Sequence, residues 1–164
     1  MTGTASGKVV VSMTVNGDRV EELVEPRWLL ADFLRENLGL TGTHVGCEHG
    51  VCGACTILMN GNSVRACLTF AVQAQGADIE TVESLGTVND LDDLQESFRK
   101  HHALQCGFCT PGMLMTAIDA LRKRPLATDQ EIRDALSGNI CRCTGYQNIV
   151  KAVRTMVQKR DGDD

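Results

Sequence analysis

The start of the chain alternates between apolar and polar residues, as paired β-strands do. Apolar residues occupy every second position from Val9 to Val15, and residues 19–24 resume the pattern after Asn16-Gly17. Asn-Gly between two such runs is typical of a tight hairpin turn. The pattern therefore predicts a β-hairpin over residues 8–24.

A helical period follows at residues 26–38. Its apolar positions are Leu30, Phe33, Leu34 and Leu38, spaced i, i+3, i+4 and i+8. Pro26 precedes them, and Gly39 is a typical helix stop. We expect a helix here that covers one face of the sheet.

The next segments predict a loop and more strands. Four glycines punctuate residues 41–54, which indicates a binding loop rather than a regular element. Residues 56–59 and 62–67 flank Asn60-Gly61 as a second hairpin, and residues 78–82 predict a last short strand. Four or five strands crossed by one helix indicate an α+β, ferredoxin-like module of the β-grasp kind.

The second half changes to helical patterns over residues 91–104, 110–124, 128–136 and 144–157. Thr110-Pro111 and Thr144 are expected to begin the second and fourth helices, and Thr128 with Glu131 forms a capping-box signature. Residues 159–164 are expected to be a disordered tail. The predicted fold class is thus α+β: an N-terminal β-grasp ferredoxin-like domain (1–82) followed by a C-terminal four-helix bundle-like domain (83–164).

Charge and hydropathy exclude several classes of protein. The formal charge is −5, with 16 basic and 21 acidic residues. The chain has no stripe of basic residues of the kind that binds nucleic acid. The chain has no run of about 18 apolar residues, which a membrane-spanning helix would need. Residues Met1 to Lys8 do not resemble an export signal. We therefore expect a cytoplasmic protein.

The 8 cysteines carry most of the chemical information. At about 5% of the chain they are too sparse for a disulfide scaffold, and cytosolic thiols are kept reduced. Metal binding is the leading interpretation.

The first set contains Cys47, Cys52, Cys55 and the more distant Cys67. The spacing C-x4-C-x2-C with a later fourth cysteine is that of plant-type [2Fe–2S] ferredoxins. Glycines around it would let backbone N–H groups approach the thiolates and sulfides. A zinc site is the alternative, although zinc sites more often use two short cysteine pairs.

The second set contains Cys106 and Cys109, followed by Cys141 and Cys143. A turn at Arg142 is needed to bring the last two thiols to one small cluster. Each pair precedes an expected helix start, so free N–H groups at two helix N-termini would face an anionic cluster. Zinc also stays open for this set.

The cysteine motifs resemble those of the iron–sulfur chain in the xanthine oxidase family of molybdenum hydroxylases. The resemblance extends from about Lys8 to Val157. It rests on the segments Gly46-Cys47, Cys52-Gly53-Ala54-Cys55-Thr56, Gln105-Cys106-Gly107-Phe108-Cys109-Thr110-Pro111-Gly112 and Asn139-Ile140-Cys141-Arg142-Cys143-Thr144-Gly145-Tyr146.

The resemblance implies one [2Fe–2S] cluster in each domain and no catalytic residue on this chain. It also implies a large molybdopterin-binding subunit, with the pterin in a dinucleotide form, and a medium FAD-binding subunit in a dimer of heterotrimers. Electrons would pass from the molybdopterin through the two clusters to FAD. Gln105 and Cys143 would face the pterin, and Tyr146 is open to two interpretations, a hydrogen bond near the cluster or simple packing.

The motifs leave further functions open. Residues 48–51 depart from the pattern usual in carbon monoxide dehydrogenase small subunits, which favours an N-heterocycle, purine or aldehyde as the substrate of the whole enzyme without excluding carbon monoxide. A free-standing two-cluster ferredoxin and a zinc-stapled interaction module are also compatible with the cysteine pattern.

Overall fold

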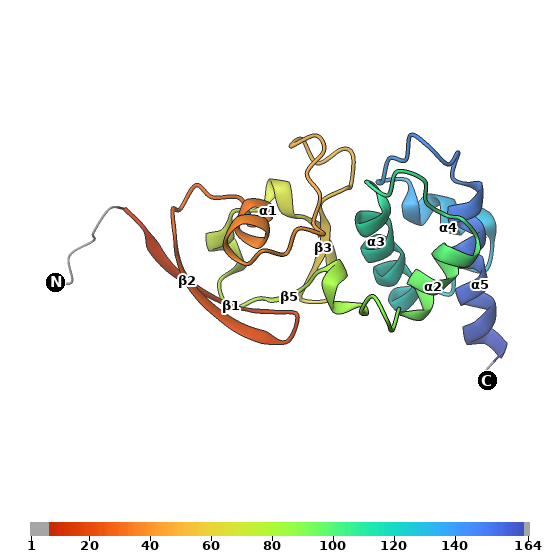
Figure 1. Ribbon diagram of the computed structural model, residues 1–164, viewed down its shortest axis with the longest axis horizontal. Helices are drawn as coiled ribbons and strands as arrows, with labels where there is room; N and C mark the ends of the chain where they lie inside the picture. The colour runs from red at the N-terminus through yellow and green to blue at the C-terminus, as the bar shows by residue number, and fades with distance from the viewer. Residues whose placement is uncertain (1–6, 163–164) are drawn as a thin grey trace.

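The computed structural model describes residues 7–162, with a sheet at one end of the long axis and helices at the other (Figure 1). The five strands are β1 (Val9–Val15), β2 (Asp18–Val24), β3 (Thr56–Met59), β4 (Asn62–Arg65) and β5 (Asp78–Glu80). Their order in the sheet is β2-β1-β5-β3-β4, in which β1 and β5 run parallel and the other neighbours are antiparallel. Both predicted hairpins are confirmed.

The second hairpin ends earlier than predicted. β4 stops at Arg65, and Cys67 lies in the 3-10 turn η2 (Ala66–Leu68) that follows it. Two further 3-10 turns, η3 (Ala71–Ala74) and η4 (Val82–Ser84), flank β5.

The helix that packs on the sheet is shorter than predicted. It consists of α1 (Leu30–Asp32) continued by the π-helical turn η1 (Phe33–Asn37), whereas Pro26 lies in a turn. The extended residue Leu29 delays the helix because it bridges to Phe70. Leu30, Phe33 and Leu34 are fully buried against the sheet, as their spacing predicted.

The second half holds α2 (Asp93–Lys100), α3 (Thr110–Lys123), α4 (Asp129–Leu136) and α5 (Gln147–Gly162). The capping box of Thr128 and Glu131 is formed at the start of α4. α5 begins three residues after Thr144, and its last turns include residues 159–162, so the expectation of a disordered tail is wrong for these four. Residues 163–164 lie outside the described part of the chain.

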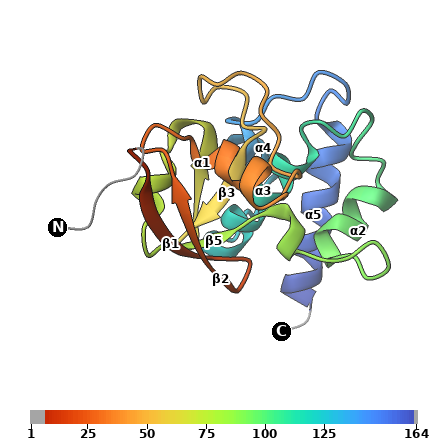
Figure 2. The same cartoon turned by 60° about the vertical axis from the view of Figure 1, so that its left-hand side comes forward.

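The two halves meet across α3, which packs on β3 and β4 on one side and on α4 on the other (Figures 1 and 2). Each half has its own apolar core, but Leu58 of β3 belongs to the core of the helices. Gly112 in the first turn of α3 lies so close to the carbonyl groups of Gly53 and Ala54 that a Cβ atom has no room. The start of α3 is therefore fitted directly against the first cysteine loop.

Candidate metal centres

The first set of thiols lies on two segments at the edge of the sheet. Cys47, Cys52 and Cys55 occupy the loop between η1 and β3, and Cys67 lies in η2 after β4. Gly53 bends this loop with φ +72°, a left-handed conformation that glycine adopts without strain. The side chains of Cys55 and Cys67 contact each other and are almost fully buried.

Two thiols of this loop differ sharply in electrostatic setting. The backbone N–H groups of His49 and Cys52 lie 3.4 Å from Cys47 Sγ and lower the pKa of that thiol to about 6. Burial raises the pKa of Cys55 to about 11. A bound metal supplies the charge that keeps such a buried thiol deprotonated.

The second set pairs its thiols across the two motifs. Cys106 Sγ lies 3.5 Å from Cys143 Sγ, and both residues are exposed. Cys109 contacts the buried Cys141, and burial followed by this contact raises the pKa of Cys109 to about 12. The chain bends at Arg142, as the spacing required.

The helix starts beside these cysteines are only partly as expected. Cys109, not Thr110, is the N-cap residue of α3, and the Thr110 hydroxyl is buried without a hydrogen-bond partner among the described residues. Thr144 does not cap α5, since its hydroxyl accepts the N–H of Tyr146 instead. One helix N-terminus, that of α3, therefore follows a cysteine motif directly.

The thiols meet in pairs rather than in one group of four. Contacts join Cys47 to Cys52, Cys55 to Cys67, Cys106 to Cys143 and Cys109 to Cys141. Across residues 7–162, no three histidine, cysteine or acidic side chains gather closely enough to hold a single ion. Each site thus has two pairs of thiols, which matches a [2Fe–2S] cluster, in which four thiolates hold two irons. The residues present thus fit two such clusters.

Residues of both cysteine loops line one cavity of about 230 Å³. Its lining includes Cys52 from the first set and all four thiols of the second. The Ile140 N–H donates to the Cys52 carbonyl at 2.9 Å, so the two loops are hydrogen-bonded backbone to backbone.

Asn139 reinforces this junction. Its Nδ2 donates to the Gly53 carbonyl at 3.0 Å, and its Oδ1 accepts from the Thr116 hydroxyl at 2.9 Å. Arg65 adds a bond from Nη2 to the Gly138 carbonyl at 2.7 Å. Sequence reasoning missed Asn139 as a junction residue, because its partners lie far away along the chain.

The remaining candidate side chains have different surroundings. Gln105 is exposed next to Cys106, and its contact with a pterin stays a prediction. Tyr146 does hydrogen-bond beside a cysteine, since its hydroxyl accepts the N–H of Cys141 at 2.9 Å. His44 stacks on Phe108 with ring centroids 4.8 Å apart.

Comparison with protein families gives two matches that cover the two halves. Residues 13–82 match the 2Fe-2S iron-sulfur cluster binding domain, and residues 81–154 match the [2Fe-2S] binding domain. The fold and the paired thiols thus define a protein with two [2Fe–2S]-binding domains.

Individual relatives show which class of iron–sulfur protein the chain is similar to. The chain is 57% identical to the caffeine dehydrogenase subunit gamma of Pseudomonas sp. (strain CBB1), over 90% of each chain. It is 55% identical to the nicotine 6-hydroxylase small subunit of Paenarthrobacter nicotinovorans, over 93% of this chain and 92% of that one.

Solved structures of similar fold belong to the same class of enzymes. Quinoline 2-oxidoreductase from Pseudomonas putida 86 matches with a TM-score of 0.88 and 53% identity, over 94% of this chain and 98% of that one. The aldehyde oxidoreductase of Desulfovibrio desulfuricans ATCC 27774 matches with a TM-score of 0.89 and 39% identity, over 94% of this chain but 17% of that longer chain.

The chain belongs to the small iron–sulfur subunits of the xanthine oxidase family of molybdenum hydroxylases. It is the electron-transfer subunit of a molybdenum-dependent oxidoreductase, and its relatives at 57% and 55% identity are named as subunits. In the described residues, no helix is both long and apolar enough to cross a membrane.

Proposed function

We propose that this subunit passes electrons from a molybdopterin subunit to a FAD subunit during oxidative hydroxylation of an N-heterocyclic substrate. Relatives at 57% and 55% identity are named for caffeine and nicotine, and the 53% identical structure is named for quinoline, all N-heterocycles. The substrate would bind on the molybdopterin subunit. When bound, the two [2Fe–2S] clusters supply one-electron acceptance and release.

The chain's own residues hold these clusters. We propose that Cys47, Cys52, Cys55 and Cys67 bind one cluster in a β-grasp domain of residues 1–82. Cys106, Cys109, Cys141 and Cys143 bind the other in a four-helix bundle-like domain of residues 83–164. The exposed Cys106 and Cys143, with Gln105 beside them, would form the side that meets the molybdopterin subunit. The assembly is proposed as a dimer of heterotrimers.

The observation that carries this proposal is the pairing of the thiols within each cysteine set. The Ile140–Cys52 hydrogen bond joins the two cysteine loops, and Cys52 lines one cavity with the second set, which suits transfer between clusters. A zinc staple needs four ligands around one ion, whereas among residues 7–162 no three histidine, cysteine or acidic side chains gather that closely. A free-standing ferredoxin is disfavoured, since the same fold makes up 17% of one longer aldehyde oxidoreductase chain.

Metal analysis of the native complex tests the proposal. We expect about four irons and four acid-labile sulfides per small chain, with two distinct reduced spectra, because the eight cysteines divide into two unlike sites. The small chain alone, loaded with iron and sulfide, should not turn over an N-heterocycle. Stoichiometric zinc in place of iron, or full turnover by the isolated chain, would contradict the proposal.

A further inference from the structure

The loop from Cys141 to Tyr146 folds back on itself through three hydrogen bonds. The Thr144 hydroxyl lies 3.1 Å from Cys141 Sγ, the Tyr146 N–H donates to Thr144 Oγ1 at 3.1 Å, and the Cys141 N–H donates to the Tyr146 hydroxyl at 2.9 Å. We call these three residues the Cys141 clasp. Among residues 7–162, Thr144 is the only residue whose side-chain hydroxyl is hydrogen-bonded to a cysteine sulfur.

The direction of the bond to sulfur follows from the charge of the ligand. A thiolate has no proton to give, so in the metal-bound state only the Thr144 hydroxyl can donate. The Tyr146 N–H occupies an acceptor position of Thr144 Oγ1 and leaves its hydrogen free for Cys141 Sγ. The clasp thus aims one donor at one thiolate.

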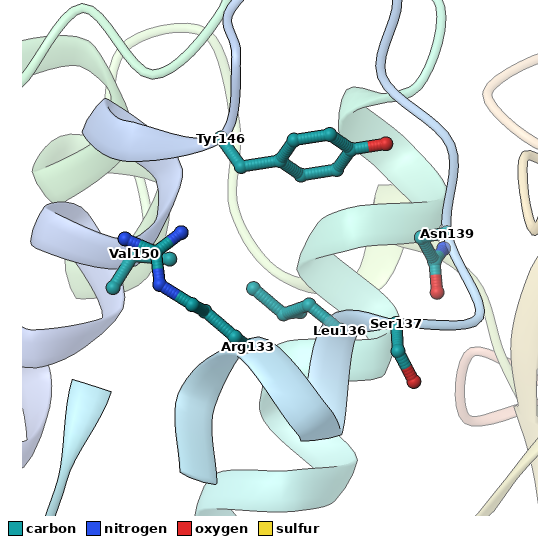
Figure 3. A pocket seen from close by; sticks show the side chains of 6 residues that line it. All are labelled: Arg133, Leu136, Ser137, Asn139, Tyr146 and Val150. Carbon is teal, nitrogen blue, oxygen red and sulfur yellow. The ribbon is translucent and has the colours of Figure 1, made fainter. Parts of the chain in front are cut away.

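Tyr146 maintains this geometry at a cost in backbone conformation. Its φ is +67°, which a bulky residue rarely adopts unless its surroundings enforce it. Its side chain lines a cavity together with Leu136 and Val150 (Figure 3). The volume of this cavity is about 240 Å³. In this backbone conformation the Tyr146 N–H donates to Thr144 while the Tyr146 hydroxyl reaches Cys141.

We propose that Thr144 sets the reduction potential of the helical-domain cluster by donating a hydrogen bond to the Cys141 thiolate, with Tyr146 as its positioning residue. Hydrogen bonds to ligand sulfur stabilise the reduced, more negative cluster and so raise its potential. Cys141 is only 8% exposed, so water screens this bond little.

The inference rests on the proposed assignment of Cys141 as a cluster ligand, and the test separates the two. Equilibrium redox titration of the whole complex, followed by the electron paramagnetic resonance of each reduced cluster, gives one midpoint potential per cluster. Absence of a second [2Fe–2S] signal in the wild-type complex would reject the proposed function. With both signals present, only the Thr144 proposal is at issue.

The key variant is Thr144→Val, which keeps the shape and removes the hydroxyl. We expect reduction of the helical-domain cluster to become about tenfold less favourable, a fall of about 59 mV for one electron. The other cluster should keep its midpoint potential. Thr144→Ser should restore the wild-type midpoint potential of the helical-domain cluster. Thr155→Val is a matched change at an exposed position of α5 and should change the midpoint potential of neither cluster.

Three results would overturn the inference. The first is an unchanged midpoint potential of the helical-domain cluster in Thr144→Val at full iron content. The second is an equal shift in the midpoint potentials of both clusters. If Thr144→Val fails to hold iron, the smaller Thr144→Ala replaces it in the same titration. The third result is loss of the helical-domain cluster in both variants, which would show that Thr144 serves assembly and would reject a role in setting the potential.

Discussion

Replacing Asn139 tests how firmly the two cysteine loops are held together. Its side chain is 1% exposed and makes two good hydrogen bonds, to Gly53 O and from the Thr116 hydroxyl. In Asn139→Ala, the Gly53 carbonyl keeps the bonds from Thr56, and the Thr116 hydroxyl can turn to its own helix backbone. Neither partner is stranded, so the cost is the net value of two hydrogen bonds, about 1–3 kcal/mol.

The measurable consequence is earlier release of iron on heating. For a chain of this size about 1 kcal/mol corresponds to about 2–4 °C, so visible iron–sulfur absorbance should disappear about 2–12 °C lower in the Asn139→Ala complex. Asn139→Asp preserves the volume but places a buried carboxylate against the Gly53 carbonyl, and should cost more than Asn139→Ala.

The matched control is Asn148→Ala. Asn148 is exposed and makes one long bond, 3.4 Å from Nδ2 to the His102 carbonyl, so its loss should change the transition by less than about 2 °C. If Asn139→Ala melted like Asn148→Ala, or if Asn139→Asp were milder than Asn139→Ala, the junction would not depend on these hydrogen bonds.

Two further predictions concern α3. Gly112→Ala should lower the temperature at which iron–sulfur absorbance disappears, because the new methyl group meets the Gly53 backbone. The control Gly162→Ala has open space around the new methyl group and should leave that temperature unchanged. Equal transition temperatures in the two variants would refute the close fit of Gly112. Asp119→Asn should lose about 1 kcal/mol at pH 7, because the carboxylate accepts from Ser63 at 2.7 Å and pairs with Lys123. Burial raises the pKa of Asp119, but these partners outweigh it and lower the pKa, so the wild-type advantage should vanish as pH falls through that lowered pKa; a pH-independent gap in unfolding measurements would contradict this.

Local patterns were enough to predict most elements of the fold. Both Asn-Gly turns lie where the alternation placed them, and the capping box at Thr128 begins α4. The errors lie at boundaries set by distant contacts. Leu29 is extended because it pairs with Phe70, and this pairing delays the helix expected from Pro26.

The cysteine motifs form two sets along the chain, and the structure brings thiols together in pairs within each set. The sequence did not show which thiols of the second set pair. Neighbours along the chain, such as Cys106 and Cys109, are not the pairs in contact; Cys106 instead meets Cys143. Such a pairing depends on how the loops fold in space. Asn139 was overlooked for the same reason, since nothing within its own segment distinguishes a junction residue from a surface asparagine.

The bond between Asn139 and Gly53 spans 86 residues, which has a consequence for biosynthesis. The first cysteine loop is translated early, yet it can complete its hydrogen bonds only after Asn139 and Ile140 have been made and α3 has docked. Until then its backbone stays accessible to water. A long-range contact of this kind forms late and slowly, because about half of the chain must first close into one loop. The nascent first loop is therefore open during the interval in which the rest of the chain is synthesised, and docking of the second half ends that interval.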